Sequence, residues 1–153
     1  MEVRVIDFFC GCGGASEGFR QAGFDIALGL DFDPKASATY RANFPEAEFI
    51  EGDIVKVTTE EVRTIVDQDT NQPLLLAACA PCQPFSSQNK AKSVRDSRRT
   101  LLDETHRFVR DLLPEYIVLE NVPGMQRVDK KKYGPFARFL KLLNDLDYEY
   151  TYF

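Results

Sequence analysis

Short apolar runs alternate along this chain with segments whose apolar positions recur every three or four residues. A short, uninterrupted apolar run is typical of a buried strand, and the longer spacing is typical of a helix with one buried face. The runs predict strands at residues 3–8, 26–30, 49–50, 73–78 and 116–119, with a further strand beginning over 148–153. The helical spacing predicts helices over 15–23, 34–44, from 58 onward, 101–113 and 136–146.

Two of these helices carry start signals. Asp33 is a good N-cap because its side chain can accept a backbone hydrogen bond, and Pro34 suits the first helical position that follows. Thr58 with Glu61 three residues later forms the pattern of a capping box.

The alternation of strands and helices predicts the fold class. It is an α/β fold with an open, mostly parallel sheet, helices on both faces and right-handed crossovers. The run over 73–78 is apolar on both faces, as a central parallel strand should be. In such sheets ligands bind beyond the carboxyl ends of the strands.

Each predicted strand is followed by an unusual cluster of residues. Because the carboxyl ends of parallel strands meet at one edge, we expect these clusters to converge there. They are the glycines of residues 11–14, Asp31, Asp53, the segment Cys79–Ser86, and Glu120 with Asn121.

Composition narrows the class of protein. The chain has 153 residues, 44% of them hydrophobic, and a formal net charge of −5. We expect one globular domain without a membrane span, since no apolar run approaches the roughly 20 residues that a span needs. Residues 1–4 lack the features of a signal peptide, so we expect a cytosolic domain with reduced cysteines.

The net charge does not point to a nucleic acid, but the local charge does. Basic residues gather over residues 90–99 and again over 127–132. A charge run is normally solvated surface. Here both runs flank the predicted ligand edge, so we expect them to contact phosphate. The single histidine, His106, is expected on the surface of its helix.

The glycines at positions 11, 13 and 14 lie between a strand and a helix, and Asp31 follows the next strand. This arrangement is typical of a loop that approaches a nucleoside, whose ribose hydroxyls an acid can bind. The pyrophosphate pattern Gly-x-Gly-x-x-Gly is missing, which favours a nucleoside without phosphates. The alternative is a tight turn with no ligand.

The segment Cys79–Ser86 has three interpretations. It is a rigid loop with incidental thiols, or part of a zinc or redox site, or the carrier of a cysteine nucleophile at Cys82. The zinc site would combine Cys79 and Cys82 with Cys10 and Cys12. Glu120 ends an apolar strand at the same edge. It is either a desolvated acid with a raised pKa or an acceptor for backbone amides.

Four segments taken together closely resemble the ordered motifs of DNA (cytosine-5) methyltransferases. They are Asp7–Gly14, Gly52–Ile54, Pro81–Ser86 and Glu120–Val122. Pro-Cys-Gln with Glu-Asn-Val is the most specific part of the resemblance. It implies a Rossmann-like methyltransferase fold that uses S-adenosylmethionine.

The resemblance also implies the cofactor site. Asp31, where the family usually has Glu, would bind the ribose, Phe32 would pack on the adenine, and Asp53 with Ile54 would recognise it. The full predicted set is Phe9, Gly11, Cys12, Gly13, Gly14, Asp31, Phe32, Asp53, Ile54, Pro81 and Leu101.

The chemistry that the resemblance implies begins with attack of Cys82 on C6 of a cytosine flipped out of double-stranded DNA. Glu120 would contact N3 and the exocyclic amine of that base, and Asn121 would hold the catalytic loop. No metal is implied. The residues expected to contact DNA are Gln83, Ser86, Ser87 and Arg98.

The resemblance covers essentially the whole chain, so residues 1–153 would be the N-terminal part of the S-adenosylmethionine-binding catalytic domain. The later motifs, the target-recognition domain and a returning helix are absent from this sequence. We expect a fragment, a truncated reading frame, or one subunit of a split bacterial restriction–modification enzyme whose complementary subunit carries recognition. Methylation of cytosine in RNA and a non-catalytic cofactor- or partner-binding module are the alternatives.

Overall fold

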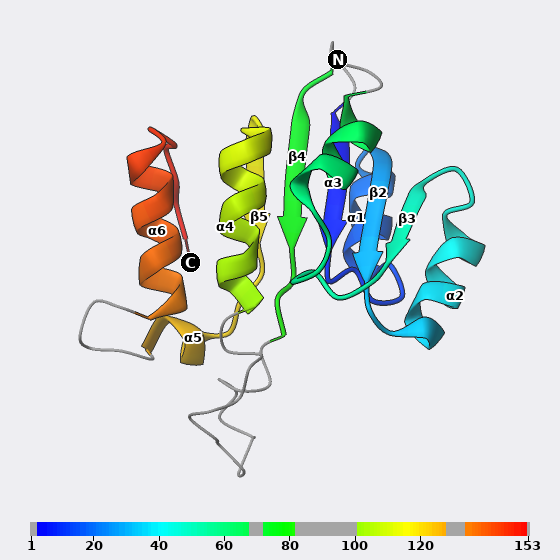
Figure 1. Ribbon diagram of the computed structural model, residues 1–153, viewed down its shortest axis with the longest axis horizontal. Helices are drawn as coiled ribbons and strands as arrows, with labels where there is room; N and C mark the ends of the chain where they lie inside the picture. The colour runs from blue at the N-terminus through cyan, green and yellow to red at the C-terminus, as the bar shows by residue number, and fades with distance from the viewer. Residues whose placement is uncertain (1–2, 68–71, 82–100, 128–133, 153) are drawn as a thin grey trace.

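Five parallel strands form one sheet in a computed structural model of the chain, which describes residues 3–67, 72–81, 101–127 and 134–152 (Figure 1). The strand order is β3-β2-β1-β4-β5, and every neighbouring pair is parallel. The predicted fold class is therefore confirmed. The strands are β1 (Arg4–Phe8), β2 (Asp25–Asp31), β3 (Glu48–Glu51), β4 (Leu74–Ala78) and β5 (Tyr116–Leu119).

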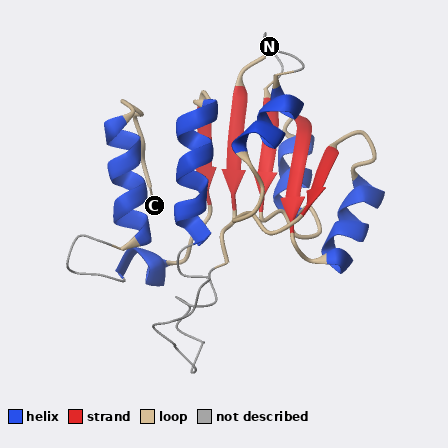
Figure 2. Ribbon diagram, in the orientation of Figure 1, coloured by secondary structure: helices blue, strands red, loops and turns tan. Residues whose placement is uncertain are grey.

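Helices follow the strands, as the apolar spacing predicts (Figure 2). They are α1 (Gly14–Gln21), α2 (Pro34–Asn43), α3 (Thr59–Val66), α4 (Leu101–Leu112), α5 (Pro123–Arg127) and α6 (Pro135–Asp145). Both capping predictions are confirmed: Asp33 accepts a bond from the Lys35 amide at 2.9 Å, and Thr58 and Glu61 form a capping box. The short helix α5 was not predicted. Within the described segments, no helix is long and apolar enough to cross a membrane.

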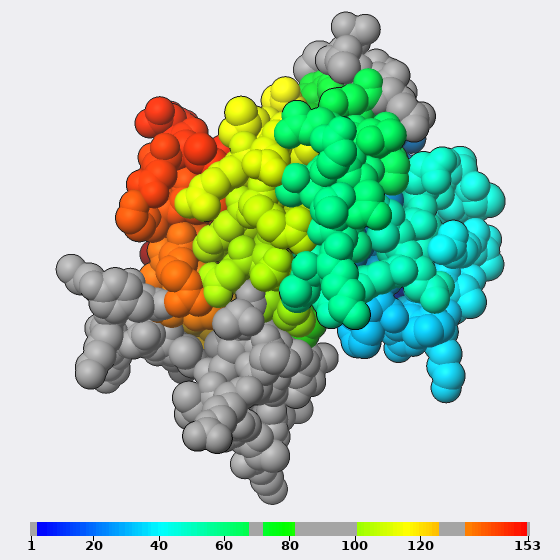
Figure 3. Space-filling model, viewed as in Figure 1, coloured from blue at the N-terminus to red at the C-terminus, as the bar shows by residue number. Residues whose placement is uncertain are grey.

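Helices cover both faces of the sheet because the strand side chains alternate between two apolar clusters. On one face Val5 packs with Tyr40 and Phe44 beneath α1 and α2. On the other face Phe8 packs with Phe108 of α4 and with residues of α3 and α6. Figure 3 shows α3, α4 and α6 side by side over this second face.

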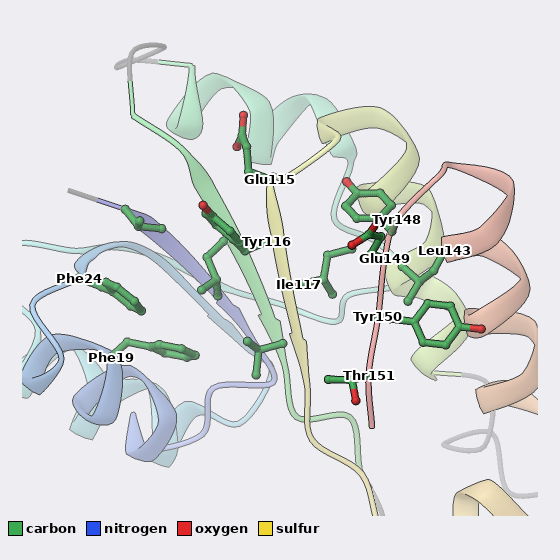
Figure 4. A pocket seen from close by; sticks show the side chains of 13 residues that line it. Phe19, Phe24, Glu115, Tyr116, Ile117, Leu143, Tyr148, Glu149, Tyr150 and Thr151 are labelled. Atoms are coloured by element: carbon green, nitrogen blue, oxygen red, sulfur yellow. The ribbon is translucent and has the colours of Figure 1, made fainter. Parts of the chain in front are cut away.

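The face of β5 that points toward the α1 side has no helix on it in the described part of the chain. Tyr116 and Val118 are 50% and 45% exposed there, while Ile117 and Leu119 pack against the opposite cluster. A groove of about 660 Å³ opens at this place, between α1 on one side and residues 148–151 on the other (Figure 4). We call it the β5 groove.

The strand predicted over 148–153 is wrong for the residues that the structure describes, since 148–152 form no strand. The chain instead ends α6 in a Schellman motif, in which Asp147 has a φ of 60°. The Tyr148 amide donates to the Leu143 carbonyl at 2.9 Å, and the Asp147 amide donates to the Asn144 carbonyl at 3.2 Å. The start of the predicted strand is therefore used to end the helix.

Candidate cofactor and active site

All five strands run in the same direction, so their carboxyl ends meet at one edge of the sheet. The predicted convergence is confirmed for the clusters that the structure describes. The edge carries the loop of residues 9–14 after β1, Asp31 at the end of β2, Asp53 after β3, Pro81 after β4 and Glu120 after β5.

The loop of residues 9–14 turns sharply between β1 and α1. Phe9, Gly11 and Gly13 have φ values of 61°, 53° and 94°, which lie in the left-handed region that favours glycine. A Cβ on Gly13 would also lie 2.3 Å from the ring of Phe44 in the segment after α2. Gly13 is therefore required by both its backbone and its packing.

Asp31 attaches this loop to β2. Its Oδ2 accepts a hydrogen bond from the Gly11 amide at 2.8 Å, and its Oδ1 accepts one from the Asp33 amide at 2.9 Å. A carboxylate oxygen can accept more than one bond, so both remain able to bind a ribose hydroxyl. This loop-holding role was not found by sequence reasoning, because it depends on residues 20 positions apart.

Beside Asp31 lies a cleft at the carboxyl edge. Leu30 and Gly52 form part of it, and Phe32 is 68% exposed at its rim. Seven of the predicted cofactor residues line this cleft: Phe9, Asp31, Phe32, Asp53, Ile54, Pro81 and Leu101.

Asp53 is oriented by the turn that it begins. Its Oδ1 accepts a bond from the Val55 amide at 3.1 Å, and its main-chain carbonyl accepts one from the Lys56 amide at 2.8 Å. Among the described residues, Oδ2 has no partner. One oxygen therefore holds the turn and the other remains for a ligand.

Four predicted cofactor residues lie apart from the cleft. Gly11 acts through its amide on Asp31. Cys12, Gly13 and Gly14 line a separate depression together with Glu17, Arg20, Asn43 and Phe44. The loop turns between these two sites, so consecutive residues of one motif face different surroundings.

Arg107 of α4 was not predicted to belong to the site. Its guanidinium donates to the main-chain carbonyl of Ile54 in the cleft wall, and it also pairs with Glu104 at 3.2 Å. The sequence contains no signal for this contact, since an arginine on an amphipathic helix is usually solvated. Arg107 therefore fixes the cleft wall from the neighbouring helix.

His106 was expected on the surface, and this is wrong. Its side chain is largely buried between α4 and α6, with its ring centroid 5.7 Å from that of Phe139. Burial lowers the pKa of His106, and the nearby Asp103 carboxylate opposes that shift. The tertiary packing of α6 on α4 covers this position.

Glu120 is exposed, and its side chain has no partner among the described residues. Its amide donates to the Ala78 carbonyl at 3.1 Å, which extends the pairing of β4 and β5. Oδ1 of Asn121 is buried and has no partner in the described part of the chain. The predicted residues Cys82, Gln83, Ser86, Ser87 and Arg98 lie outside the described residues.

The described cysteines have three different environments. Cys10 is buried, Cys12 is exposed and Cys79 is partly buried. Burial, with the charges of Asp7 and Asp31, raises the pKa of Cys10, so this residue packs as a neutral thiol. Within the described segments, no three His, Cys, Asp or Glu side chains are grouped as metal ligands.

Comparison with known proteins gives one family. The family model of C-5 cytosine-specific DNA methylases matches residues 3–153. The Type II methyltransferase M.AquIA of Picosynechococcus is 38% identical over 132 residues, which cover 86% of this chain and 53% of the relative. The Type II methyltransferase M.XorII of Xanthomonas oryzae is 40% identical over 136 residues, which cover 89% of this chain and 30% of the relative.

Solved structures agree in fold. A protein described as a prophage-encoded DNA modification methyltransferase from E. coli superposes with a TM-score of 0.76 at 30% identity, over 94% of this chain and 38% of that one. The Dnmt2 methyltransferase of S. pombe has a TM-score of 0.67 at 22% identity and shares the fold. The chain thus spans about half, or less, of the length of the proteins that it matches.

Proposed function

Because this chain belongs to the C-5 cytosine-specific DNA methylase family, we propose that it is the cofactor-binding and catalytic part of a DNA (cytosine-5)-methyltransferase. The cofactor of this family is S-adenosylmethionine. The observation that carries the proposal is the cleft, because motif residues from separate segments of the chain line it together. We assign the whole chain to the N-terminal part of the catalytic domain.

The residues that line the cleft offer contacts for the adenosine part of the cofactor. The exposed ring of Phe32 offers a stacking surface for the adenine, and Oδ2 of Asp53 can accept a bond from the exocyclic amine. Asp31 offers oxygens to the ribose hydroxyls at the same rim. When bound, S-adenosylmethionine supplies the methyl group.

The catalytic step that we propose uses Cys82, which follows β4 in the sequence, and Glu120, which follows β5. The Cys82 thiolate forms a bond to C6 of a flipped cytosine, and the electron pair of the C5–C6 double bond shifts to C5 and by conjugation toward N3, so that C5 becomes nucleophilic. The carboxylic acid of Glu120, after β5, donates a hydrogen bond to N3 and accepts one from the exocyclic amine, which stabilises the negative charge that builds up on the ring. Once C5 carries the methyl group, C5 loses its proton, the double bond re-forms and the carbon–sulfur bond breaks. Asn121 beside Glu120 positions the loop that carries Cys82.

Double-stranded DNA is the proposed substrate. Gln83, Ser86, Ser87 and Arg98 would contact it next to the nucleophile, together with phosphate contacts from the basic runs over 90–99 and 127–132. The Type II methyltransferase relatives favour a bacterial restriction–modification system in the cytoplasm. Methylation of cytosine in structured RNA by the same residues is the alternative substrate.

A complementary polypeptide is the proposed partner, and it would carry target recognition. The chain spans 53% of M.AquIA and 30% of M.XorII, so these relatives contain much more chain than this one. The β5 groove is the surface that we assign to this partner. Parallel sheets have helices on both faces, and here Tyr116 and Val118 lie uncovered over the groove.

The roles of the two cysteines after β4 can be separated by substitution. We expect Cys82→Ser to abolish methyl transfer in the presence of the complementary polypeptide, while S-adenosylmethionine affinity of the chain stays within about tenfold, roughly 1.4 kcal/mol. Cys79→Ser is the matched control and should retain both properties. Calorimetry measures the affinity, and transfer of labelled methyl groups to duplex DNA and to structured RNA measures the activity.

The outcomes decide between the interpretations. Loss of cofactor binding in both cysteine variants, with zinc in the purified wild-type chain, would favour the four-cysteine metal site. Methylation of the RNA alone would replace DNA as the substrate. Cofactor binding without covalent trapping of DNA that contains 5-fluorocytosine would indicate a non-catalytic module.

A further inference from the structure

Three buried polar side chains form a hydrogen-bonded series beneath the loop of residues 9–14. Asp7 of β1, Ser16 of α1 and Tyr40 of α2 are each 0% exposed. The Ser16 hydroxyl donates to Oδ2 of Asp7 at 2.7 Å, so the Tyr40 hydroxyl, 2.9 Å from Ser16 Oγ, must donate to Ser16. The direction of donation is therefore from Tyr40 through Ser16 to the carboxylate.

This chain of hydrogen bonds fixes the start of α1. The N-cap residue, Gly13, has no side chain that could cap the helix. Asp7 on the neighbouring strand instead holds the first turn of α1 through the Ser16 side chain, and its other oxygen, Oδ1, is buried without a partner in the described part of the chain. Movement of Asp7 would thus move both the helix start and the loop before it.

Among the described residues, the surroundings of Asp7 contain a second carboxylate, that of Asp31, and no cation paired with either. Burial raises the pKa of Asp7 to about 6; the hydrogen bond from the Ser16 hydroxyl opposes this shift, and the charge of Asp31 on β2 adds to it. The other titratable groups that face Asp7 are the Cys10 thiol and the Tyr40 hydroxyl, and both are neutral at pH 7 because burial raises their pKa values. Among the described residues, no Lys, Arg or His pairs with Asp7 or Asp31.

A ligand with a positive charge would reduce the electrostatic repulsion between these two carboxylates. S-Adenosylmethionine carries a sulfonium, an ammonium and a carboxylate, so its net charge is +1. S-Adenosylhomocysteine, the product that remains after methyl transfer, lacks the sulfonium charge and is neutral overall. The two ligands therefore differ in the charge to which buried carboxylates respond.

We propose that Asp7 is a positioning residue that holds the loop of residues 9–14 through Ser16 and Tyr40, and that its ionisation strengthens binding of S-adenosylmethionine more than that of S-adenosylhomocysteine. The inference rests on the proposed cofactor site. It adds that the charge of Asp7, which does not line the cleft, makes the affinities for the substrate and product forms of the cofactor differ.

Proton linkage gives the direction in which the cofactor affinity should change with pH. A cationic ligand favours the ionised carboxylate and so lowers the pKa of Asp7 when it binds. Affinity for S-adenosylmethionine then rises as the pH increases from 5.0 to 7.5, by about fivefold if the pKa falls by about one unit on binding. Affinity for S-adenosylhomocysteine should change by less than about threefold.

Calorimetry with both ligands at pH 5.0, 6.0 and 7.5 tests the proposal on the full chain. Asp7→Asn keeps the shape of the side chain but cannot ionise, so its affinities should not depend on pH in this range. His106→Gln is the matched control, because it removes a different buried titratable group, which lies between α4 and α6. This variant should retain the wild-type pH profile.

A second measurement uses the wild-type chain and so does not depend on folding of the Asp7→Asn variant. The Asp7 carboxyl carbon should titrate in NMR spectra, the Ser16 and Gly11 amides should shift with the same midpoint, and S-adenosylmethionine should lower that midpoint.

Two results would overturn the inference while leaving the proposed function in place. They are equal pH profiles for the two ligands, or an unchanged profile in Asp7→Asn. Failure of the wild-type chain to bind either ligand at any pH would overturn the proposed cofactor site and the inference with it.

Discussion

At the scale of single residues, Asp31 and Asp53 show how carboxylates prepare a site before any ligand binds. Asp31 uses both oxygens on backbone amides, of Gly11 and Asp33. Asp53 uses one oxygen on the Val55 amide. These bonds fix the side chains in place, so ligand binding loses little side-chain entropy there.

The partnerless oxygen of Asp53 leads to a prediction. Asp53→Asn should weaken S-adenosylmethionine binding by about 1.5–3 kcal/mol, the range for a hydrogen bond to a charged group. Asparagine can keep the turn bond to Val55 through its carbonyl oxygen, but its amide group would then meet the adenine amine as a second donor. Calorimetry gives the affinity, and circular dichroism checks that the fold is retained.

Glu51 supplies the matched control, since it is an exposed carboxylate at the end of β3 that does not line the cleft. Glu51→Gln should leave the affinity unchanged. Equal affinities for the wild type and Asp53→Asn would remove Asp53 from the adenine site.

At the scale of elements, two glycines of the α1 region have opposite structural roles. Gly13 has a φ of 94° and faces the Phe44 ring, whereas Gly18 lies within α1 with open space around the position of a Cβ. Gly18→Ala should stabilise the chain by about 0.5–1 kcal/mol, because alanine loses less backbone entropy in a helix. Gly13→Ala should destabilise it by at least about 1–2 kcal/mol, the cost of the left-handed conformation before any clash.

Urea denaturation of the two variants measures both effects against the wild type. Each Gly→Ala variant is thus the control for the other, since the same substitution is made at two positions that are five residues apart in sequence. A neutral or stabilising Gly13→Ala would mean that the loop of residues 9–14 relaxes without cost, and the packing argument for Gly13 would be wrong.

At the scale of the whole molecule, the β5 groove is an uncovered surface with exposed apolar side chains. Tyr116 and Val118 are exposed on it, and β5 is also an edge strand. Apolar edges of this kind promote pairing with another chain. We therefore expect the isolated chain to self-associate through this face at high concentration.

Sedimentation velocity over a concentration series tests this expectation. Val118→Lys should shift the series toward monomer by several-fold in the association constant, because a lysine on an edge strand opposes pairing. Val55→Lys is the matched control: Val55 is 55% exposed, follows β3 and lies away from the groove. If both variants, or neither, change the association, the β5 groove is not the contact face.

The local sequence determined most of the elements. The predicted strand 116–119 agrees with the structure residue for residue, and the capping box at Thr58 begins α3 as predicted. Such features depend on neighbours within a few positions, where backbone propensity and capping act. The alternation of strands and helices predicts that the strands are parallel. The convergence of their carboxyl ends at one edge of the sheet follows from that.

The motifs in the sequence also indicated the family and most of the residues that line the cleft. The sequence could not show how those residues divide their tasks. Asp31 holds Gly11, Arg107 holds Ile54 from another helix, and Gly13 packs on Phe44. Each of these contacts joins residues that are far apart in the chain, so no local pattern specifies it.

Two further features depend on tertiary packing, and a third depends on how a helix ends. His106 is buried because α6 packs on α4. The strand predicted over 148–153 is absent from the described residues because Asp147 and Tyr148 end α6. Asp7, Ser16 and Tyr40 come from three elements and meet only beneath the folded loop. Local propensity therefore set the elements, while burial and hydrogen bonding between distant residues set the charge and geometry of the candidate site.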